Sequence, residues 1–253
     1  MSFSTNKNSL KNNFNRHGPW ALVAIVVAVA VIYEIGKHHS LNAVDVMSFV
    51  GLIIAVVFHE AAHGLVAYWC GDDTAKVAKR ITLNPIRHID ILGSIIVPIV
   101  LILTVGIPFG WAKPVPVSIN KLRHPRNQAV LVSFAGPVIN ILLALVAGFL
   151  FKEVLTPQLL NTPIDNLPIQ YMFLFLFGEV NVLVACFNLI PIPPLDGSAI
   201  LERIIPKEML PQYYKLRMMS MVFVFILVLL LPSVVDSISI HALTYWADIV
   251  GLR

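Results

Sequence analysis

Residues 58–64 combine two histidines and a glutamate at a spacing that suits metal-dependent chemistry. The segment reads FHEAAHG, so His59 and His63 are four residues apart and Glu60 follows the first of them. Positions four apart share one face of a helix, so both imidazoles can bind one Zn²⁺ while Glu60 reaches a water molecule beside it. The pattern predicts a zinc hydrolase site.

The surroundings of this motif strengthen that interpretation. The motif lies within an apolar run, residues 44–69, which is long enough to cross a bilayer. Ionisable side chains are costly inside a membrane and usually serve a function there. The alternative is that these polar side chains only hydrogen-bond neighbouring helices. We favour the metal site.

A catalytic zinc usually has three protein ligands, and Asp196 is the best candidate for the third. It lies in residues 188–197, which read NLIPIPPLDG. Three prolines should end a helix there, because they lack N–H donors and their rings clash with the preceding turn. The unwound backbone can direct the Asp196 carboxylate into the helix bundle. A solvated aspartate in an ordinary turn remains the alternative.

Residues 134–140, FAGPVIN, place a further polar side chain inside an apolar run. Gly136 and Asn140 share a helix face, where the small residue allows a close helix approach and the amide needs a partner. Asn140 can donate a hydrogen bond to a substrate carbonyl or to a developing oxyanion. A contact between helices is the competing role.

Composition assigns the chain to membranes. Of its 253 residues, 57% are hydrophobic and 13% are charged, and the mean hydropathy is +0.80. Such values lie outside the range of ordinary soluble domains. We expect an all-α polytopic membrane protein with about six hydrophobic segments. These apolar runs are residues 20–36, 44–69, 91–107, 128–151, 171–190 and 218–235.

No internal repeat or long linker divides the chain, so we expect one membrane domain over residues 1–253. It comprises a basic tail (1–19), a core (47–200) and a C-terminal membrane segment with its tail (218–253). Pro-rich, alternating sequence predicts short strands in the 108–120 region. The net charge of +4 does not indicate nucleic-acid binding, because the basic residues flank hydrophobic runs.

The distribution of Lys and Arg predicts the topology. The N-terminal tail and residues 70–90, 108–127 and 201–217 are basic, so all four should be cytoplasmic. Segment 91–107 would then be re-entrant, and the runs 44–69 and 171–190 would point in the same direction. Their polar ends, with His59 and Asp196, would meet. With six full crossings, the two runs would point in opposite directions, and these ends would lie on opposite sides of the membrane.

Taken together, three motifs on separate hydrophobic segments resemble the site-2 protease family of intramembrane metalloproteases. They are HExxH at 59–63, GPxxN at 136–140 and NxxPxPxLDG at 188–197, and residues 109–117 also resemble a loop of that family. The resemblance covers roughly residues 47–200. It implies that His59, His63 and Asp196 bind one Zn²⁺ per chain, that Glu60 is the base, and that Asn140, with Asn188 as a further candidate, assists at the substrate.

The expected function is therefore hydrolysis of peptide bonds in single-span membrane proteins, within or near the bilayer. The resemblance implies a minimal, prokaryotic member without a PDZ or CBS domain, located in the cytoplasmic membrane. We expect the unwound substrate to pair with residues 111–119 as an added strand. Two alternatives remain, a zinc transporter and a non-catalytic scaffold. A transporter needs a polar pathway, for which the spans offer few ionisable groups. The sequence does not set the oligomeric state.

Overall fold

Three long helices form the centre of the protein in the computed structural model, which describes residues 42–105, 111–156, 159, 162–213 and 232–252. They are α2 (Ala43–Trp69), α5 (Pro125–Val154) and α7 (Ile169–Leu189). Each is long and apolar enough to cross a membrane. The protein is thus a helical, integral membrane protein. The predicted run 20–36 and most of 218–235 lie outside the described residues.

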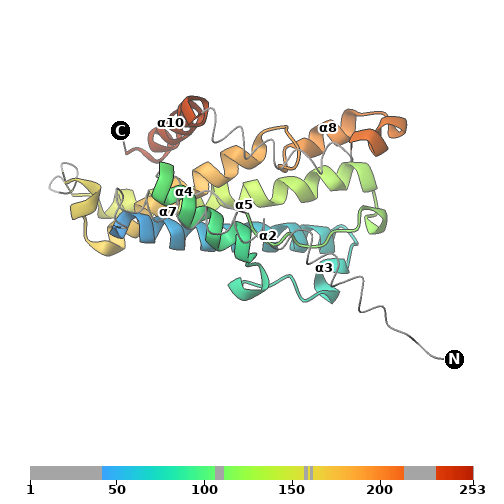
Figure 1. The fold of residues 1–253 in the computed structure, drawn as a ribbon, viewed down its shortest axis with the longest axis horizontal. Helices are drawn as coiled ribbons and strands as arrows, with labels where there is room; N and C mark the ends of the chain where they lie inside the picture. Colours follow the sequence, from blue (N-terminus) through green and yellow to red (C-terminus); the bar gives the residue numbers. More distant parts are fainter. Residues whose placement is uncertain (1–41, 106–110, 157–158, 160–161, 214–231, 253) are drawn as a thin grey trace, which may run out of the picture.

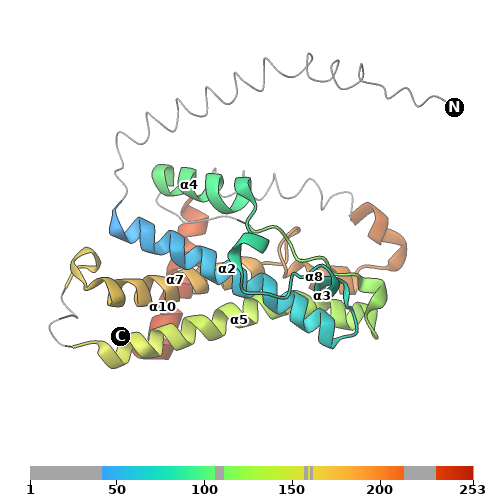
Figure 2. The same cartoon turned by 90° about the horizontal axis from the view of Figure 1, so that it is seen from below.

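The shorter elements lie around this bundle. They are α3 (Thr74–Val77), the 3₁₀ turn η1 (Pro85–Arg87), the π-helix η2 (Ile91–Ile96), α4 (Val97–Val105), the 3₁₀ turns η3 (Ile119–Lys121) and η4 (Ile164–Asn166), α8 (Ser198–Ile204), the 3₁₀ turn η5 (Lys207–Met209) and α10 (Pro232–Val250). Helix α4 lies outside the bundle of the three long helices (Figure 2). The site is therefore built mainly from the three long helices and their connections.

Helices α2 and α7 run in the same direction, and α5 runs against both (Figures 1 and 2). Small and branched side chains fill the contact between α2 and α7, where Ala55, Leu52 and Val180 are at most 3% exposed. Small residues let helix backbones approach closely where lipid provides no hydrophobic driving force. This parallel course is the one that the predicted meeting of His59 and Asp196 requires.

No strand occurs among the described residues, so the strands expected at 108–120 are not found over 111–120. Pro114 and Pro116 lack N–H groups, which removes two donors that a strand ladder needs. Single hydrogen bonds to other parts of the chain hold the segment instead. The Lys113 N–H donates to the His88 carbonyl at 2.9 Å, and a guanidinium N–H of Arg80 donates to the Lys113 carbonyl at 2.6 Å.

The π-helix η2 is attached to the start of this extended segment. The Trp111 N–H donates to the Gly93 carbonyl (3.0 Å), and the Ser94 hydroxyl donates to the Trp111 carbonyl (2.8 Å). A Cβ at Gly93 would lie 2.3 Å from the Trp111 indole, so only glycine allows this close approach. The two segments therefore form one unit beside α2.

Asp72 attaches the other end of the extended segment to the end of α2. Its side chain is 0% exposed and accepts hydrogen bonds from the Ser118 N–H (2.6 Å), the Thr74 N–H (3.0 Å) and the Thr74 hydroxyl. Burial by itself raises the pKa of the carboxyl, but these hydrogen bonds more than offset it, so the pKa of Asp72 lies below its usual range. The ionised form of Asp72 thus stabilises the fold.

We predict that Asp72→Asn destabilises the protein and flattens its acid sensitivity. An amide cannot accept all three bonds, and the cost should be about 1–3 kcal/mol. Because the folded pKa is depressed, the wild-type stabilisation is complete above the unfolded pKa of about 3.9 and is lost as the pH falls through the lower folded value. Thermal unfolding of the detergent-solubilised protein between about pH 6 and about pH 3 measures both effects.

Asp73→Asn is the matched control. Asp73 is the neighbouring carboxylate, its ion pair with Lys121 (2.7 Å) is about half exposed, and exposed pairs contribute little. An equal loss of stability in the two variants, or an Asp72→Asn variant with the same acid sensitivity as the wild type, would contradict the role given to Asp72.

Candidate metal centre

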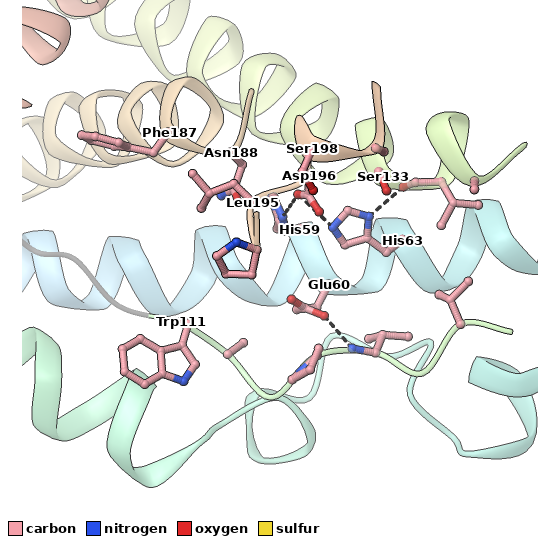
Figure 3. A pocket seen from close by; sticks show the side chains of 18 of the residues that line it. His59, Glu60, His63, Trp111, Ser133, Phe187, Asn188, Leu195, Asp196 and Ser198 are labelled. Atoms are coloured by element: carbon pink, nitrogen blue, oxygen red, sulfur yellow. Dashed lines mark hydrogen bonds and ion pairs between the residues drawn. The ribbon is translucent and has the colours of Figure 1, made fainter. Parts of the chain in front are cut away.

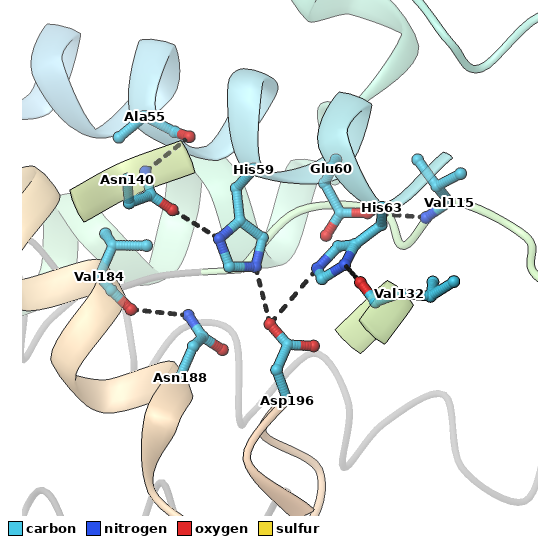
Figure 4. Close-up of polar contacts among 10 residues, drawn as sticks. All are labelled: Ala55, His59, Glu60, His63, Val115, Val132, Asn140, Val184, Asn188 and Asp196. Atoms are coloured by element: carbon cyan, nitrogen blue, oxygen red, sulfur yellow. Dashed lines mark hydrogen bonds and ion pairs between the residues drawn. The ribbon is translucent and has the colours of Figure 1, made fainter. Parts of the chain in front are cut away.

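Three potential metal ligands from distant parts of the chain converge in the bundle. His59 and His63 lie on one face of α2 and are 6% and 9% exposed. Oδ2 of Asp196 lies 2.9 Å from Nε2 of His59 and 3.3 Å from Nε2 of His63 (Figure 4). The possible ligand atoms all lie within 4.8 Å of one another. The structure thus brings together the three residues that the sequence proposed as ligands.

A tight loop after α7 places Asp196 beside the two histidines. Helix α7 ends at Leu189, just before the three prolines, as predicted. The loop closes on itself, because the Gly197 N–H donates to the Asn188 carbonyl at 2.7 Å. A Cβ at Gly197 would lie 2.3 Å from the Leu189 carbonyl oxygen. Glycine is therefore required for the return of the chain, and the Asp196 carboxylate faces the histidines.

The protonation of the His63 ring follows from its partner. Nδ1 of His63 lies 2.7 Å from the carbonyl oxygen of Val132 on α5. A carbonyl oxygen can only accept, so Nδ1 carries the hydrogen, and in the neutral ring that binds a metal Nε2 presents its lone pair toward Asp196. The carbonyl therefore sets both the tautomer and the orientation of the ring.

The His59 ring is held in the same tautomer by an amide. Its Nδ1 lies 2.6 Å from Oδ1 of Asn140, which is completely buried. The NH₂ group of Asn140 donates to the Ala55 carbonyl (3.2 Å) and to Oδ1 of Asn181 (2.7 Å), so its oxygen must face His59. His59 therefore donates from Nδ1, and its Nε2 also presents a lone pair.

This arrangement fits a bound cation. Two imidazole lone pairs and one carboxylate oxygen face one another, and without positive charge between them they repel. A tetrahedral zinc with bonds near 2.0–2.1 Å separates two ligand atoms by about 3.3 Å. The distances from Oδ2 of Asp196 to the two histidine nitrogens, 2.9 and 3.3 Å, are close to this value. Two histidines and a carboxylate are a ligand set that catalytic zinc uses. His59, His63 and Asp196 can therefore hold zinc.

Glu60 lies on the side of α2 that faces the extended segment (Figure 3). It is half-buried, and its Oε2 accepts a hydrogen bond of 2.7 Å from the Val115 N–H. Glu60, the two histidines and Asp196 all line a cavity of about 740 Å³. Sequence reasoning did not foresee the bond from Val115, because 55 positions separate its two partners.

The two asparagines proposed from the motifs occupy different positions. Asn188 lines the cavity, and its NH₂ group donates to the Val184 carbonyl one turn earlier at 2.9 Å. Asn140 lies behind His59 and is not among the residues that line the cavity. A direct contact of Asn140 with substrate stays a prediction, and the observed geometry gives this amide a different partner, the His59 ring.

Sequence reasoning did not identify Asn181, the residue that holds the Asn140 amide. The available signal was an uncharged amide within the apolar sequence of α7, where a polar side chain needs a partner.

Comparison with known proteins identifies the family. Residues 162–230 match peptidase family M50. The chain is 43% identical to YwhC of Bacillus subtilis over 162 residues, which cover 61% of this chain and 67% of YwhC. It is 29% identical to Rip2 of Mycobacterium tuberculosis over 186 residues, 74% of this chain and 68% of Rip2. Both relatives carry names that describe them as zinc metalloproteases. No solved structure matches the chain.

The apolar helices define an integral membrane protein, and the three converging side chains give it a candidate metal centre. The chain belongs to peptidase family M50 and is a zinc metalloprotease. Its family therefore agrees with the resemblance to the site-2 proteases drawn from the motifs.

We predict that Gly136→Ala on α5 removes zinc without unfolding the protein. The added Cβ would lie 2.5 Å from Nε2 of His59 and 2.6 Å from Nε2 of His63, where it would displace at least one ring. Zinc affinity of the purified variant, measured by competition with a chelator together with its helix content, checks the prediction. We expect less than about a tenth of the wild-type zinc affinity, since loss of even a supporting group costs about 10–100-fold.

Gly51→Ala on α2 is the control for this substitution. Its added Cβ meets Phe177 at 3.6 Å, which is ordinary van der Waals contact. The Gly51→Ala variant should bind zinc with wild-type affinity. Wild-type zinc affinity in Gly136→Ala would show that the metal does not lie between the two rings.

Proposed function

We propose that this protein is an intramembrane zinc endopeptidase that hydrolyses peptide bonds of single-span membrane proteins within or near the bilayer. The observation that carries the proposal is the convergence of His59, His63 and Asp196 on a cavity between helices long enough to cross a membrane. The lone pairs at this point need a cation, and zinc is the metal of this protease family.

In the proposed mechanism, His59, His63 and Asp196 hold one zinc ion and Glu60 handles the protons. When bound, zinc supplies Lewis acidity, which polarises a carbonyl and acidifies water. Glu60 takes a proton from the water whose oxygen adds to the scissile carbonyl carbon. It then gives that proton to the leaving nitrogen as the C–N bond breaks. The hydrogen bond from Val115 keeps the Glu60 carboxylate beside the cavity while its second oxygen serves as the base.

The lining of the cavity supports a substrate that is partly apolar and partly polar. Leu52, Val56 and Phe187 line one part of the cavity, whereas Arg126 and Arg203 line another. Leu52 precedes His59 by seven residues on α2, which corresponds to about 10 Å of helix. A cavity of this length accommodates about three residues of extended chain on the apolar side. We propose that the scissile bond lies near the polar end of a substrate transmembrane helix.

The proposed topology has five crossings and a re-entrant segment at 91–107 in the cytoplasmic membrane. Two features support it. Helices α2 and α7 run in parallel. The apolar helical stretch from Ile91 to Leu103 measures about 20 Å at the usual helical rise, less than the roughly 30 Å of hydrocarbon. Water would then reach Glu60 from the cytoplasmic side, through the cavity that Glu60 lines.

The substrate must leave helical geometry to be cleaved, and we propose that it pairs with residues 111–119. The stretch 113–116 can offer few donors to a new strand. Two of its four residues are prolines, and the other two N–H groups already bond to His88 and Glu60. Pairing would therefore depend on substrate N–H groups that donate to carbonyls of this segment, and on Val117 as a donor beyond the prolines.

We predict that Glu60→Gln abolishes cleavage and leaves zinc binding intact. The amide cannot take a proton from water, so the rate should fall by at least about a hundredfold. Purified wild type, the variant and a chelator-treated sample are compared on a panel of single-span substrates while bound zinc is assayed. About one zinc per chain should remain in the variant, because three ligands are unchanged. Near-normal turnover by Glu60→Gln would refute its assignment as the base.

We predict that Val117→Pro slows cleavage about tenfold while zinc content stays normal, because one lost backbone hydrogen bond to substrate costs about 1 kcal/mol or slightly more. Val117→Ala keeps the N–H group and serves as the control for the lost side chain. If the proline variant cleaves as fast as the alanine variant, the strand-pairing proposal is wrong at this position.

A further inference from the structure

We propose that Asn181 on α7 is a positioning residue that fixes the His59 ring through Asn140. Hydrogen bonds between uncharged groups link the three residues, and we call this chain the relay. It runs from Asn181 on α7 through Asn140 on α5 to the candidate metal ligand His59 on α2. The inference rests on the proposed zinc site, and it assigns a role to a residue that lies outside all three motifs.

The two asparagines of the relay are completely enclosed. Asn140 and Asn181 are both 0% exposed. The NH₂ group of Asn181 donates to the Phe177 carbonyl one turn earlier on α7 (2.8 Å), which leaves its Oδ1 to accept from Asn140 (2.7 Å). Oδ1 of Asn140 in turn accepts from Nδ1 of His59 at 2.6 Å. Each link therefore has a defined donor and acceptor.

Only one orientation of the Asn140 amide satisfies these partners. If the amide were reversed, its oxygen would face the oxygens of Asn181 and Ala55, and its NH₂ group would face Nδ1 of His59. His59 would then accept at Nδ1 and carry its hydrogen on Nε2, so that no lone pair would be available to a metal. Asn181 provides the shorter of the two contacts that prevent this reversal, at 2.7 Å against 3.2 Å for Ala55.

The other histidine explains why the relay is needed. His63 donates to the backbone carbonyl of Val132, a group with no second orientation. An amide has one donating and one accepting side, so its direction must be imposed by further partners. A carboxylate in the place of Asn140 would accept from His59 without ambiguity, but it would bury a charge in an apolar bundle at considerable cost. A neutral pair of asparagines achieves the same orientation.

A relay and a simple contact between helices predict different results. A buried Asn140–Asn181 contact that only joins α5 to α7 would affect stability, and zinc affinity of the folded protein would not change. A relay requires that Asn181 affect zinc binding and that it do so only through Asn140. The second condition is a test of additivity, because a residue that acts through another loses its effect when the other is absent.

The experiment measures zinc affinity by competition with a chelator, and the absorption spectrum of the cobalt-substituted protein, for the full-length chain in detergent. The variants are Asn181→Leu, Asn140→Leu, the double variant, and Val180→Ala as a packing control at the neighbouring buried position of α7. We expect zinc affinity to fall about 10–100-fold in Asn140→Leu and by about tenfold in Asn181→Leu. The double variant should match Asn140→Leu, and Val180→Ala should match the wild type.

A smaller substitution, Asn181→Ala, keeps the test decisive if Asn181→Leu does not fold. It also removes the amide that holds Asn140. Adding Asn181→Ala to Asn140→Leu should leave zinc affinity unchanged, because the group through which Asn181 acts is already absent. A further loss in that background would overturn the relay.

Other outcomes also decide the question. Wild-type zinc affinity and cobalt spectrum in Asn181→Leu, or additive losses in the double variant, overturn the relay while the zinc site stands. A wild-type protein that binds no zinc overturns the proposed function and the relay with it.

Discussion

Three lone pairs that face one another inside an apolar bundle are the constraint on which the rest of this structure depends. The Nε2 atoms of His59 and His63 and an oxygen of Asp196 lie within 4.8 Å of one another. Such a group is unfavourable without a cation, because repulsion is strong where water is scarce. A site of this kind must be assembled by rigid elements, and here α2, α5 and the loop after α7 each contribute to it.

Neutral groups hold the ligands in place. A backbone carbonyl orients His63, and an amide orients His59. Charged partners would perform the same task at greater cost in a membrane. Two glycines are as important as the polar groups, since Gly136 leaves space for the rings and Gly197 lets the chain return along the end of α7. The site therefore depends on the lack of a side chain at these two glycines as well as on the polar side chains around the ligands.

The cavity side of the site is built differently from the side that faces the bundle. Behind the histidines, every described polar group of the relay is buried and paired. In front of them, Glu60 is half-buried beside an extended segment that its neighbours hold at both ends, through Trp111 and through Asp72. This difference agrees with the chemistry of hydrolysis, because ligands must be fixed whereas water and substrate must enter.

The sequence by itself determined the features that depend on local spacing and composition. Helical periodicity put His59 and His63 on one face of a helix and Glu60 beside the first of them, hydropathy assigned the chain to membranes, and the prolines ended α7 before Asp196. It also predicted strands at 108–120 that the described residues do not form, because side chains and single backbone contacts hold that segment instead.

Only the tertiary structure decided which groups meet. Asp196 meets His59 across 137 positions of sequence, and Asn140 meets Asn181 across 41. Such pairs depend on how each helix is rotated about its axis and how far it is shifted along its neighbour. Those quantities are set by packing over the whole bundle rather than by any local pattern.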